Sequence, residues 1–156
     1  MNYLAGPFFN PAQVAVIKQI ETLVETVMGW TLYSPRRDGG VLLDMTPEVR
    51  AANARRLFVE NVDRITQSDH VIAVIDDRDP GTVWELGYAY CLRRGREMLG
   101  NGTKPRIISF TNHDYGLNIM IQECVDAHCR GIGQLQACLK SGRWEDFRMF
   151  DRAKST

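Results

Sequence analysis

The sequence predicts one doubly wound α/β domain with a mostly parallel sheet of about five strands. Short apolar runs alternate with longer segments of helical periodicity, a pattern typical of parallel strands joined by helical crossovers. The run at residues 71–75 is unbroken and mostly β-branched, as expected of a central strand that is covered on both faces. The chain of 156 residues is 44% hydrophobic and 24% charged, which is the composition of one globular domain. We therefore expect a single domain over residues 1–156, without a linker or an internal repeat.

Four of the strands are visible as apolar runs at residues 3–5, 31–33, 71–75 and 107–108. Parallel strands need long connections, so helices should separate them. Turn-forming residues are concentrated in two further segments, which we expect to be loops, at residues 34–45 and 100–105.

The first crossover repeats apolar side chains at helical spacing over residues 16–27 and should end near Gly29. Thr46 and Pro47 supply an N-cap and a first-turn proline for a second helix, which should run to about Thr66. Three more helical patterns follow, the last with an irregular tail, at residues 83–94, 118–127 and 134–150. This order of elements is that of a flavodoxin-like or Rossmann-like sheet.

The charge pattern excludes several classes of partner. Lysine and arginine total 19, aspartate and glutamate also total 19, and no basic run exceeds two residues, so the basic surface of a nucleic-acid-binding protein is missing. No stretch approaches the roughly 20 apolar residues of a membrane span, and the N-terminus lacks the pattern of a signal peptide. We expect a cytoplasmic protein that binds a small molecule or another protein.

The four cysteines contain no CxxC pair, so reduced thiols without a ligand are the preferred interpretation. A metal site built from Cys124, His128 and Cys129 is the alternative. Neither a metal ion nor a cofactor is expected.

Ligands of doubly wound sheets bind beyond the carboxyl ends of the strands, which directs attention to the sequence DDRDPGTVWE after residues 71–75. Asp76, Asp77 and Asp79 lie close together there, and their mutual repulsion should raise the pKa of the least solvated carboxyl group. That group could then donate a proton near neutral pH. A Mg²⁺ site and a solvated loop are the alternatives for the same three residues.

Glu85 has two possible roles in the same segment. Thr82 and Glu85 match the capping box S/T-x-x-E, in which the glutamate serves only to cap the helix. A carboxylate in the first turn is also kept ionised by the helix dipole, and this is the state that a nucleophile needs. One carboxyl group that gives a proton and one that stays anionic are what glycosidic bond cleavage requires.

The turn after the first strand, AGPFFNP, matches neither GxGxxG nor GxxxxGK[ST], so the usual dinucleotide and triphosphate sites are absent. Gly6 allows a ligand to approach the backbone closely. Phe8 and Phe9 offer a flat apolar surface, although core positions would explain both residues equally well.

Together, the segments YLAGPFFN, SPRRDGG, FVENVDRITQSDHVIAVID, DPGTVWELGYAY and YGLNIMIQECVDAH resemble the nucleoside 2-deoxyribosyltransferases. The resemblance covers the chain to about residue 128. It implies transfer of 2-deoxyribose from one purine or pyrimidine base to another through a covalent deoxyribosyl–enzyme intermediate. The expected partners are thus a deoxynucleoside and a free nucleobase, in nucleoside salvage.

The resemblance also implies roles for single residues. Glu85 corresponds to the nucleophile that attacks the anomeric carbon, and Asp79 to the acid that assists departure of the base. Tyr3 would hydrogen-bond to the glutamate and orient it. Phe8 resembles the residue that stacks on the base, and Gly6 the residue that leaves room for it.

Four further positions are substrate-binding candidates by the same resemblance. Asn61 stands where familiar members have an aspartate near the base, so it can contact the base but cannot ionise. Gly81 lies in the turn before Glu85. Asn118 corresponds to the residue that reaches into a neighbouring subunit's site to bind the sugar hydroxyls, with Met120 beside it. The resemblance therefore implies a homo-oligomer that is at least a dimer.

Two other functions remain open. The first is a hydrolase of deoxynucleoside 5′-monophosphates, whose familiar members hold the phosphate with serines after the first strand; no serine stands there, but Arg36 and Arg37 could bind a phosphate. The second is a nucleotide-sensing module on the same fold, in which Glu85 only caps a helix.

Overall fold

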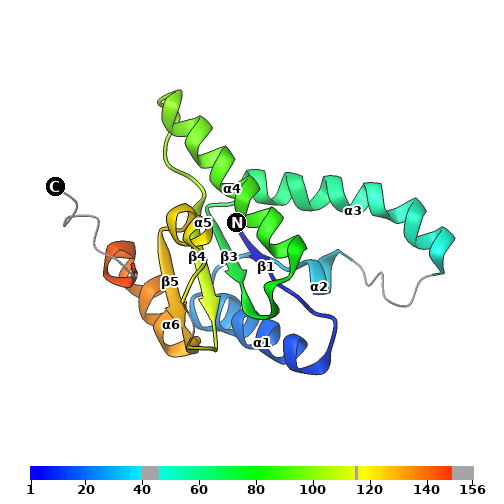
Figure 1. Cartoon of the computed structure of the whole chain (residues 1–156), viewed down its shortest axis with the longest axis horizontal. Helices are drawn as coiled ribbons and strands as arrows, with labels where there is room; N and C mark the ends of the chain where they lie inside the picture. Colours follow the sequence, from blue (N-terminus) through cyan, green and yellow to red (C-terminus); the bar gives the residue numbers. More distant parts are fainter. Residues whose placement is uncertain (40–45, 115, 149–156) are drawn as a thin grey trace.

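The computed structural model describes residues 1–39, 46–114 and 116–148. Its centre is a five-stranded, all-parallel sheet with the strand order β2-β1-β3-β4-β5 (Figure 1). The strands are β1 (Asn2–Ala5), β2 (Leu32–Tyr33), β3 (His70–Val74), β4 (Arg106–Thr111) and β5 (Ala127–Arg130). The predicted doubly wound fold is confirmed, and the β-branched run forms the central strand.

Helices cover both faces of this sheet (Figure 1). On one face lie α1 (Pro11–Thr22), which continues into a π-helical turn η1 (Leu23–Val27), and α6 (Gly131–Ser141). On the other face lie α3 (Pro47–Gln67), α4 (Pro80–Met98) and α5 (Ile119–Cys124). The remaining turns are α2 (Pro35–Asp38) and the 3₁₀ turns η2 (Asp76–Arg78) and η3 (Trp144–Phe147).

The alternation of side chains along the strands divides the core into two layers. Leu4, Ile72 and Ile108 face the layer beneath α1 and α6. Their neighbours Tyr3 and Val71 face the layer beneath α3, α4 and α5. The register thus places the Tyr3 side chain under α4, the helix that carries Glu85.

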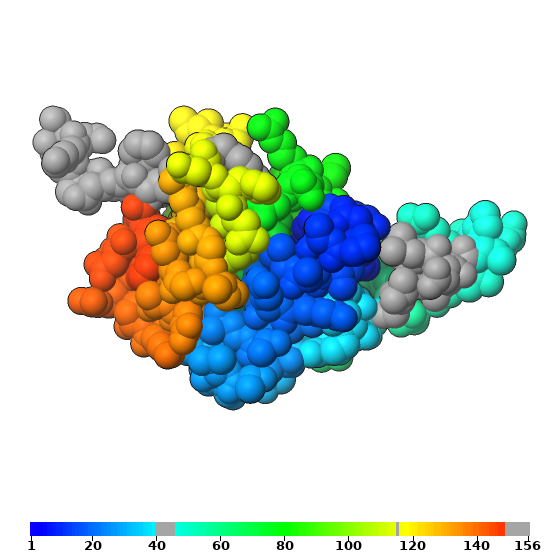
Figure 2. All heavy atoms as spheres, turned by 90° about the horizontal axis from the view of Figure 1, so that it is seen from below, coloured from blue at the N-terminus to red at the C-terminus, as the bar shows by residue number. Residues whose placement is uncertain are grey.

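Helix α3 begins as predicted, because Thr46 accepts a hydrogen bond from the backbone N–H of Val49 and Pro47 occupies the first turn. Its amino-terminal half extends beyond the rest of the domain (Figures 1 and 2). Val49 and Phe58 on this helix are 46% and 47% exposed. Residues 47–52, in the first turns of α3, are all exposed.

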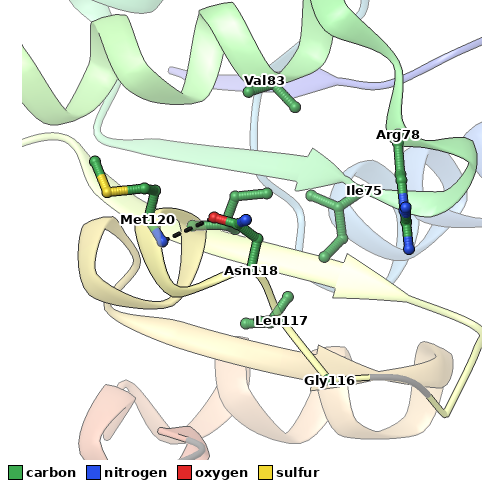
Figure 3. A pocket seen from close by; sticks show the side chains of 8 residues that line it. Ile75, Arg78, Val83, Gly116, Leu117, Asn118 and Met120 are labelled. Carbon is green, nitrogen blue, oxygen red and sulfur yellow. Dashed lines mark hydrogen bonds between the residues drawn. The ribbon is translucent and has the colours of Figure 1, made fainter.

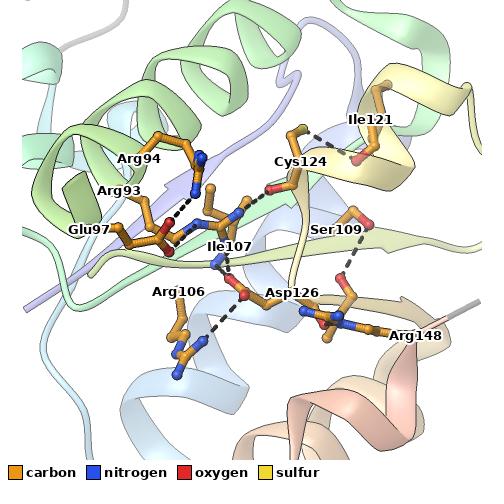
Figure 4. Close-up of polar contacts among 11 residues, drawn as sticks. Arg93, Arg94, Glu97, Arg106, Ile107, Ser109, Ile121, Cys124, Asp126 and Arg148 are labelled. Carbon is orange, nitrogen blue, oxygen red and sulfur yellow. Dashed lines mark hydrogen bonds and ion pairs between the residues drawn. The ribbon is translucent and has the colours of Figure 1, made fainter. Parts of the chain in front are cut away.

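The predicted helix over 118–127 is shorter than its sequence pattern. Helix α5 ends at Cys124, and residues 127–130 form the edge strand β5, which the pattern did not reveal. Asp126 explains the change: its carboxylate accepts a hydrogen bond from the backbone N–H of Ile107 at 2.8 Å and pairs with Arg93 (Figure 4). These contacts hold the chain beside β4, which a continuing helix would prevent.

Two other predicted boundaries also differ. Helix α4 begins three residues before position 83 and runs past position 94 to Met98. The last helix covers Gly131–Ser141 and is followed by η3, while residues 149–156 and part of the predicted loop, 40–45, lie outside the described residues. No helix within the described ranges is both long and apolar enough to cross a membrane.

Candidate active site

The candidate site is centred on a hydrogen bond between β1 and α4. The Tyr3 hydroxyl donates to Oε1 of Glu85 at 2.5 Å, although the two residues are 82 positions apart in the chain. The Tyr3 side chain is completely buried, and Glu85 is half-buried. The structure therefore brings together the two residues that the resemblance pairs.

The predicted capping box is wrong. Asp79, not Thr82, is the N-cap of α4: its Oδ2 accepts from the backbone N–H of Thr82 at 2.7 Å and from its hydroxyl at 2.8 Å. Asp79 forms the better start because Pro80 then occupies the first helical position. Glu85 consequently lies beyond the first turn, where no cap is needed, and its carboxylate contacts Tyr3 instead.

The environment of Glu85 favours its protonated form. Burial raises the pKa of this carboxyl group to about 7, the Tyr3 hydrogen bond lowers it, and the nearby charge of Asp79 raises it. The expectation that the helix dipole keeps Glu85 ionised is thus not met, because removal from water outweighs the dipole. Both protonation states of Glu85 are populated at neutral pH.

The three aspartates after β3 do not form a cluster. Asp76 accepts from the Thr111 hydroxyl, Asp77 accepts from the side-chain amide of Gln13 at 2.8 Å, and Asp79 caps α4. Within residues 1–39, 46–114 and 116–148, no three His, Cys, Asp or Glu side chains are placed to hold a metal ion. The carboxylates diverge because each has its own partner, so the shared Mg²⁺ site considered above is not formed.

The backbone is strained at this turn. Asp77 and Arg78 have positive φ angles of 63° and 53°, which residues other than glycine adopt rarely. Such conformations persist where the surrounding structure imposes them, often near functional sites. The strain lies directly before Asp79 and the start of α4.

The turn after β1 presents an aromatic surface. Phe8 is half-buried and stacks on Phe9 at 5.6 Å between ring centroids, and Phe9 is 59% exposed. The alternative that both rings belong to the core is therefore wrong. Packing within the chain also explains the glycine at position 6, because a Cβ atom there would lie 2.6 Å from Cδ1 of Ile17.

Asn61 on α3 is connected to the central pair through Tyr33, a residue that sequence reasoning missed. The Tyr33 hydroxyl lies 3.5 Å from Oδ1 of Asn61, and its ring stacks on Tyr3 with centroids 5.8 Å apart. The sequence contained one indication that Tyr33 belongs near Tyr3, because both tyrosines lie in short apolar strands. Only the pairing of β1 with β2 makes them neighbours.

Asn118 and Met120 line a separate pocket of about 520 Å³ (Figure 3). Oδ1 of Asn118 accepts from the backbone N–H of Met120 at 2.9 Å and so caps α5, and Met120 is 76% exposed. The other lining residues are Ile75, Arg78, Val83, Gly116, Leu117 and Ile121. Glu85 and Tyr3 are not among them, so this pocket does not join Asn118 to Glu85.

The two candidates for binding a phosphate, Arg36 and Arg37, are engaged in local ion pairs. Arg36 binds Glu21 through two hydrogen bonds of 3.1 and 2.6 Å. Arg37 pairs with Glu25 at 2.7 Å and with Asp38 at 2.8 Å. These ion pairs engage both guanidinium groups that the phosphate-binding alternative would require.

Gly81 lies in the first turn of α4, where a Cβ atom would be 3.1 Å from Oδ2 of Asp79. A side chain there would crowd the capping carboxylate. Gly81 therefore has a role in the Asp79 cap, apart from any contact with substrate.

The metal site considered for the cysteines does not form. Cys124 lies in the layer beneath α3, α4 and α5, whereas Cys129 lies in the opposite layer. His128 points its Nδ1 toward the Ser109 hydroxyl at 2.9 Å. Because the sheet separates the two thiols, they cannot share an ion with His128.

The fold and the tyrosine-bound carboxylate define a class, a doubly wound domain with an acidic site at the start of the helix after its central strand. A family model described as nucleoside 2-deoxyribosyltransferase matches residues 2–120. The chain belongs to this family, whose enzymes act on the N-glycosidic bonds of nucleosides. No curated protein matches the sequence.

Solved structures share the fold at low sequence identity. A 2-deoxyribosyltransferase from Bacillus psychrosaccharolyticus superposes with a TM-score of 0.65 and 24% identity, covering 97% of this chain and 93% of its own. A conserved protein from Enterococcus faecalis V583 gives 0.62 and 16%, covering 90% and 97%. A CMP N-glycosidase from Clostridium botulinum gives 0.52 and 17%, covering 90% and 99%. These similarities support the doubly wound fold.

Proposed function

We propose that the protein is a nucleoside 2-deoxyribosyltransferase that exchanges the purine or pyrimidine base of a 2′-deoxynucleoside, with Glu85 as the nucleophile. The observation that carries this proposal is the hydrogen bond from the buried Tyr3 hydroxyl to Glu85. Among the described residues, a single donor, on Oε1, holds the carboxylate in place and leaves Oε2 for attack. Membership of the family supplies the substrate class.

The reaction proceeds in two steps, in which the bond between Glu85 and the sugar is first formed and then broken. Oε2 of Glu85 forms a bond to the anomeric carbon while the bond from that carbon to the base nitrogen breaks, and the leaving base takes its electron pair and a proton from Asp79. A second base then returns a proton to Asp79, attacks the same carbon and releases Glu85. Oδ1 of Asp79 accepts no hydrogen bond from the described residues, which leaves it available for this proton.

The pKa of Glu85 suits this role. A carboxyl group with a pKa of about 7 is ionised in a large fraction of molecules at neutral pH. Its raised pKa also makes the carboxylate more basic than an ordinary glutamate, so it is a better nucleophile once ionised. Desolvation therefore limits the ionised fraction but increases the reactivity of that fraction.

The proposed contacts with the base and the rest of the substrate come from four residues, Gly6, Phe8, Asn61 and Gly81. Phe8 is placed to stack on a base, because its ring is half-buried and belongs to the exposed Phe8–Phe9 surface. Asn61 can hydrogen-bond to the base through its amide. No metal ion or cofactor takes part in the proposed reaction.

We further propose that each site is completed by a second copy of the chain. Asn118 lines a pocket that Glu85 does not reach, and hydrophobic side chains beside it are exposed, Ile119 at 67% and Met120 at 76%. The amide nitrogen of Asn118 has no hydrogen-bond partner among the described residues. It is thus available to bind a sugar hydroxyl in the site of a neighbouring subunit.

The nearest alternative is hydrolysis of a 5′-monophosphate, in which water takes the sugar. Similarity of fold to an N-glycosidase is compatible with it. The ion pairs of Arg36 and Arg37 weigh against it, since binding a phosphate there would require breaking contacts to Glu21 and Glu25. Exchange activity therefore needs to be compared directly with hydrolysis.

The decisive experiment incubates the protein with a deoxynucleoside and a different free base and follows the new nucleoside by chromatography. Glu85→Gln preserves the size of the side chain and a hydrogen bond with Tyr3 but removes the nucleophile. We expect its exchange rate to fall by at least roughly a thousandfold. Glu97→Gln, on the same helix, is the matched control and should retain activity, because the ion partners of Glu97 are Arg93 and Arg94, not Glu85 or Tyr3.

Thermal melts of both variants separate chemistry from folding. Normal melting with lost exchange in the Glu85 variant supports the nucleophile. Release of free base from a monophosphate, without a new nucleoside, would replace the transferase by the hydrolase. Binding of nucleosides with neither reaction would indicate a sensing module.

A further inference from the structure

Tyr3 and Tyr33 form a stack that follows from strand register. The two residues are paired across the parallel strands β1 and β2, so their side chains lie on the same face of the sheet. Their rings are 5.8 Å apart between centroids and inclined by only 16°. Offset stacking of this kind is favourable and directional.

A cation also lies over the Tyr33 ring. The guanidinium carbon of Arg64 lies 5.0 Å from the ring centroid, so the ring contacts both Tyr3 and a cation from α3. The Tyr33 hydroxyl lies 3.5 Å from Oδ1 of Asn61 on the same helix. Tyr33 is 5% exposed and thus has little freedom to leave this position.

We propose that Tyr33 is a positioning residue, which holds the Tyr3 phenol against Glu85 through its ring and joins this stack to Asn61 through its hydroxyl. The inference rests on the proposed function of Glu85 as nucleophile. Tyr33 does not touch the carboxylate itself. It acts through Tyr3, whose hydroxyl would otherwise move with any lateral shift of the ring.

The reaction requires the Glu85 carboxylate to be placed precisely, and this is why the support of the Tyr3 ring matters. A displacement of about 1 Å in a reacting group can cost on the order of a hundredfold in rate. Tyr3 makes one hydrogen bond to Glu85, and a single bond does not define the position of a ring. The stack with Tyr33 adds a directional constraint to this bond and to the packing of Tyr3 in the core.

The charged groups around this stack come from several elements. Glu85 faces Tyr3 on β1 and Asp79 at the start of α4. Tyr33 faces Glu60 and Arg64 on α3 and Asp38 on α2, and burial raises its pKa to about 12. Burial also raises the pKa of Tyr3 far above its ordinary value. Both hydroxyl groups therefore remain protonated donors at neutral pH.

Two substitutions separate the ring from the hydroxyl. Tyr33→Phe keeps the stack and removes the contact with Asn61, whereas Tyr33→Leu removes the stack as well. Tyr90→Leu is the matched control, because Arg93 lies 5.3 Å over the Tyr90 ring but this ring does not stack on Tyr3. Arg64→Met removes the cation and leaves both rings. It is the alternative variant if Tyr33→Leu does not fold.

The first measurement is the pKa of Glu85, obtained from an NMR titration of the protein with ¹³C-labelled glutamate. Glu85→Gln identifies the resonance of Glu85. In Tyr33→Leu we expect this pKa to rise by roughly half a unit, because a misplaced phenol stabilises the carboxylate less. Arg64→Met should shift it in the same direction by less. Tyr33→Phe and Tyr90→Leu should leave it unchanged.

The second measurement is kcat/KM for base exchange as a function of pH. Tyr33→Leu should lose about 10- to 100-fold, with the acid limb moved upward. Tyr33→Phe should keep the limb and change mainly the KM for the acceptor base.

An unchanged Glu85 pKa and an unchanged pH profile in folded Tyr33→Leu would overturn the inference, as would an equal effect of Tyr90→Leu. If Tyr33→Leu does not fold, an unchanged pKa in Arg64→Met overturns it. An active Glu85→Gln would instead refute the proposed function. The NMR titration distinguishes the two failures because it does not depend on turnover.

Discussion

At the scale of the residue, the proposed chemistry depends on how Tyr3 and its surroundings set the protonation of Glu85. Folding raises the pKa of this group from an ordinary value of 4.5 to about 7. The native state therefore binds this proton more tightly than the unfolded chain does. The resulting stabilisation is complete below the unfolded pKa and is lost as the pH rises through about 7.

Tyr3→Phe tests the contribution of the phenol. The Tyr3 hydrogen bond lowers the pKa of Glu85, so its removal should raise this pKa further. Exchange activity should then require a higher pH, with the acid limb displaced upward. Thermal melts of the variant between pH 5 and pH 8 should show a larger loss of stability with rising pH than those of the wild type. An acid limb that moves downward would contradict this account.

At the scale of the element, the turn from β1 to α1 depends on close packing. A Cβ atom on Gly6 would lie 2.6 Å from Cδ1 of Ile17 and 3.0 Å from Cβ of Val74. Ile17 belongs to α1 and Val74 to β3, so Gly6 lets the helix lie close to the sheet. The same approach sets the direction of the chain toward Phe8.

Gly6→Ala should destabilise the protein by about 1–3 kcal/mol through overpacking, measured by chemical denaturation. Ile17→Val in the same chain removes the nearest atom and should recover part of the loss, because the two positions are in contact. Gly95→Ala is the control, since nothing lies within 4 Å of a Cβ atom at that position of α4. It should be neutral or stabilising. Equal losses at both glycines would refute the packing explanation.

At the scale of the whole molecule, apolar surface is concentrated on the side formed by α3 and α4. Phe58 and Trp84 are both 47% exposed, and their rings lie 5.4 Å apart between centroids. Trp84 also stacks on Tyr88 at 5.4 Å. Such a surface is typical of a contact between proteins, which agrees with the proposed second copy.

Mixing two inactive variants tests whether sites are completed between subunits. Glu85→Gln lacks the nucleophile, and Asn118→Ser lacks the amide while it keeps a side chain that can cap α5. Co-expression of the two should restore about a quarter of the wild-type exchange activity in a dimer, because half of the dimers contain one intact site of two. Chromatography of the new nucleoside measures the recovery. A mixture as inactive as its components would show that Asn118 does not act across subunits.

Local patterns in the sequence determined the class of fold, the strands up to β4 and the start of α3 at Thr46, and they indicated the segment that contains the candidate site. Periodicity, turn residues and caps act over a few neighbouring residues, so a single chain displays them. Even there, the cap of α4 was misassigned, because Thr82 satisfies the pattern but Asp79 and Pro80 make the better helix start. The pairing of Tyr3 with Glu85 came from the family resemblance and not from any local rule.

Only the tertiary structure decided the rest. It formed β5 through the contacts of Asp126 with Arg93 and Ile107, stacked Tyr33 on Tyr3, and placed Asn118 in a pocket apart from Glu85. It also determined that Glu85 has a pKa of about 7. These properties depend on which distant segments exclude water from one another, and desolvation of a carboxyl group is not encoded by its neighbours in sequence.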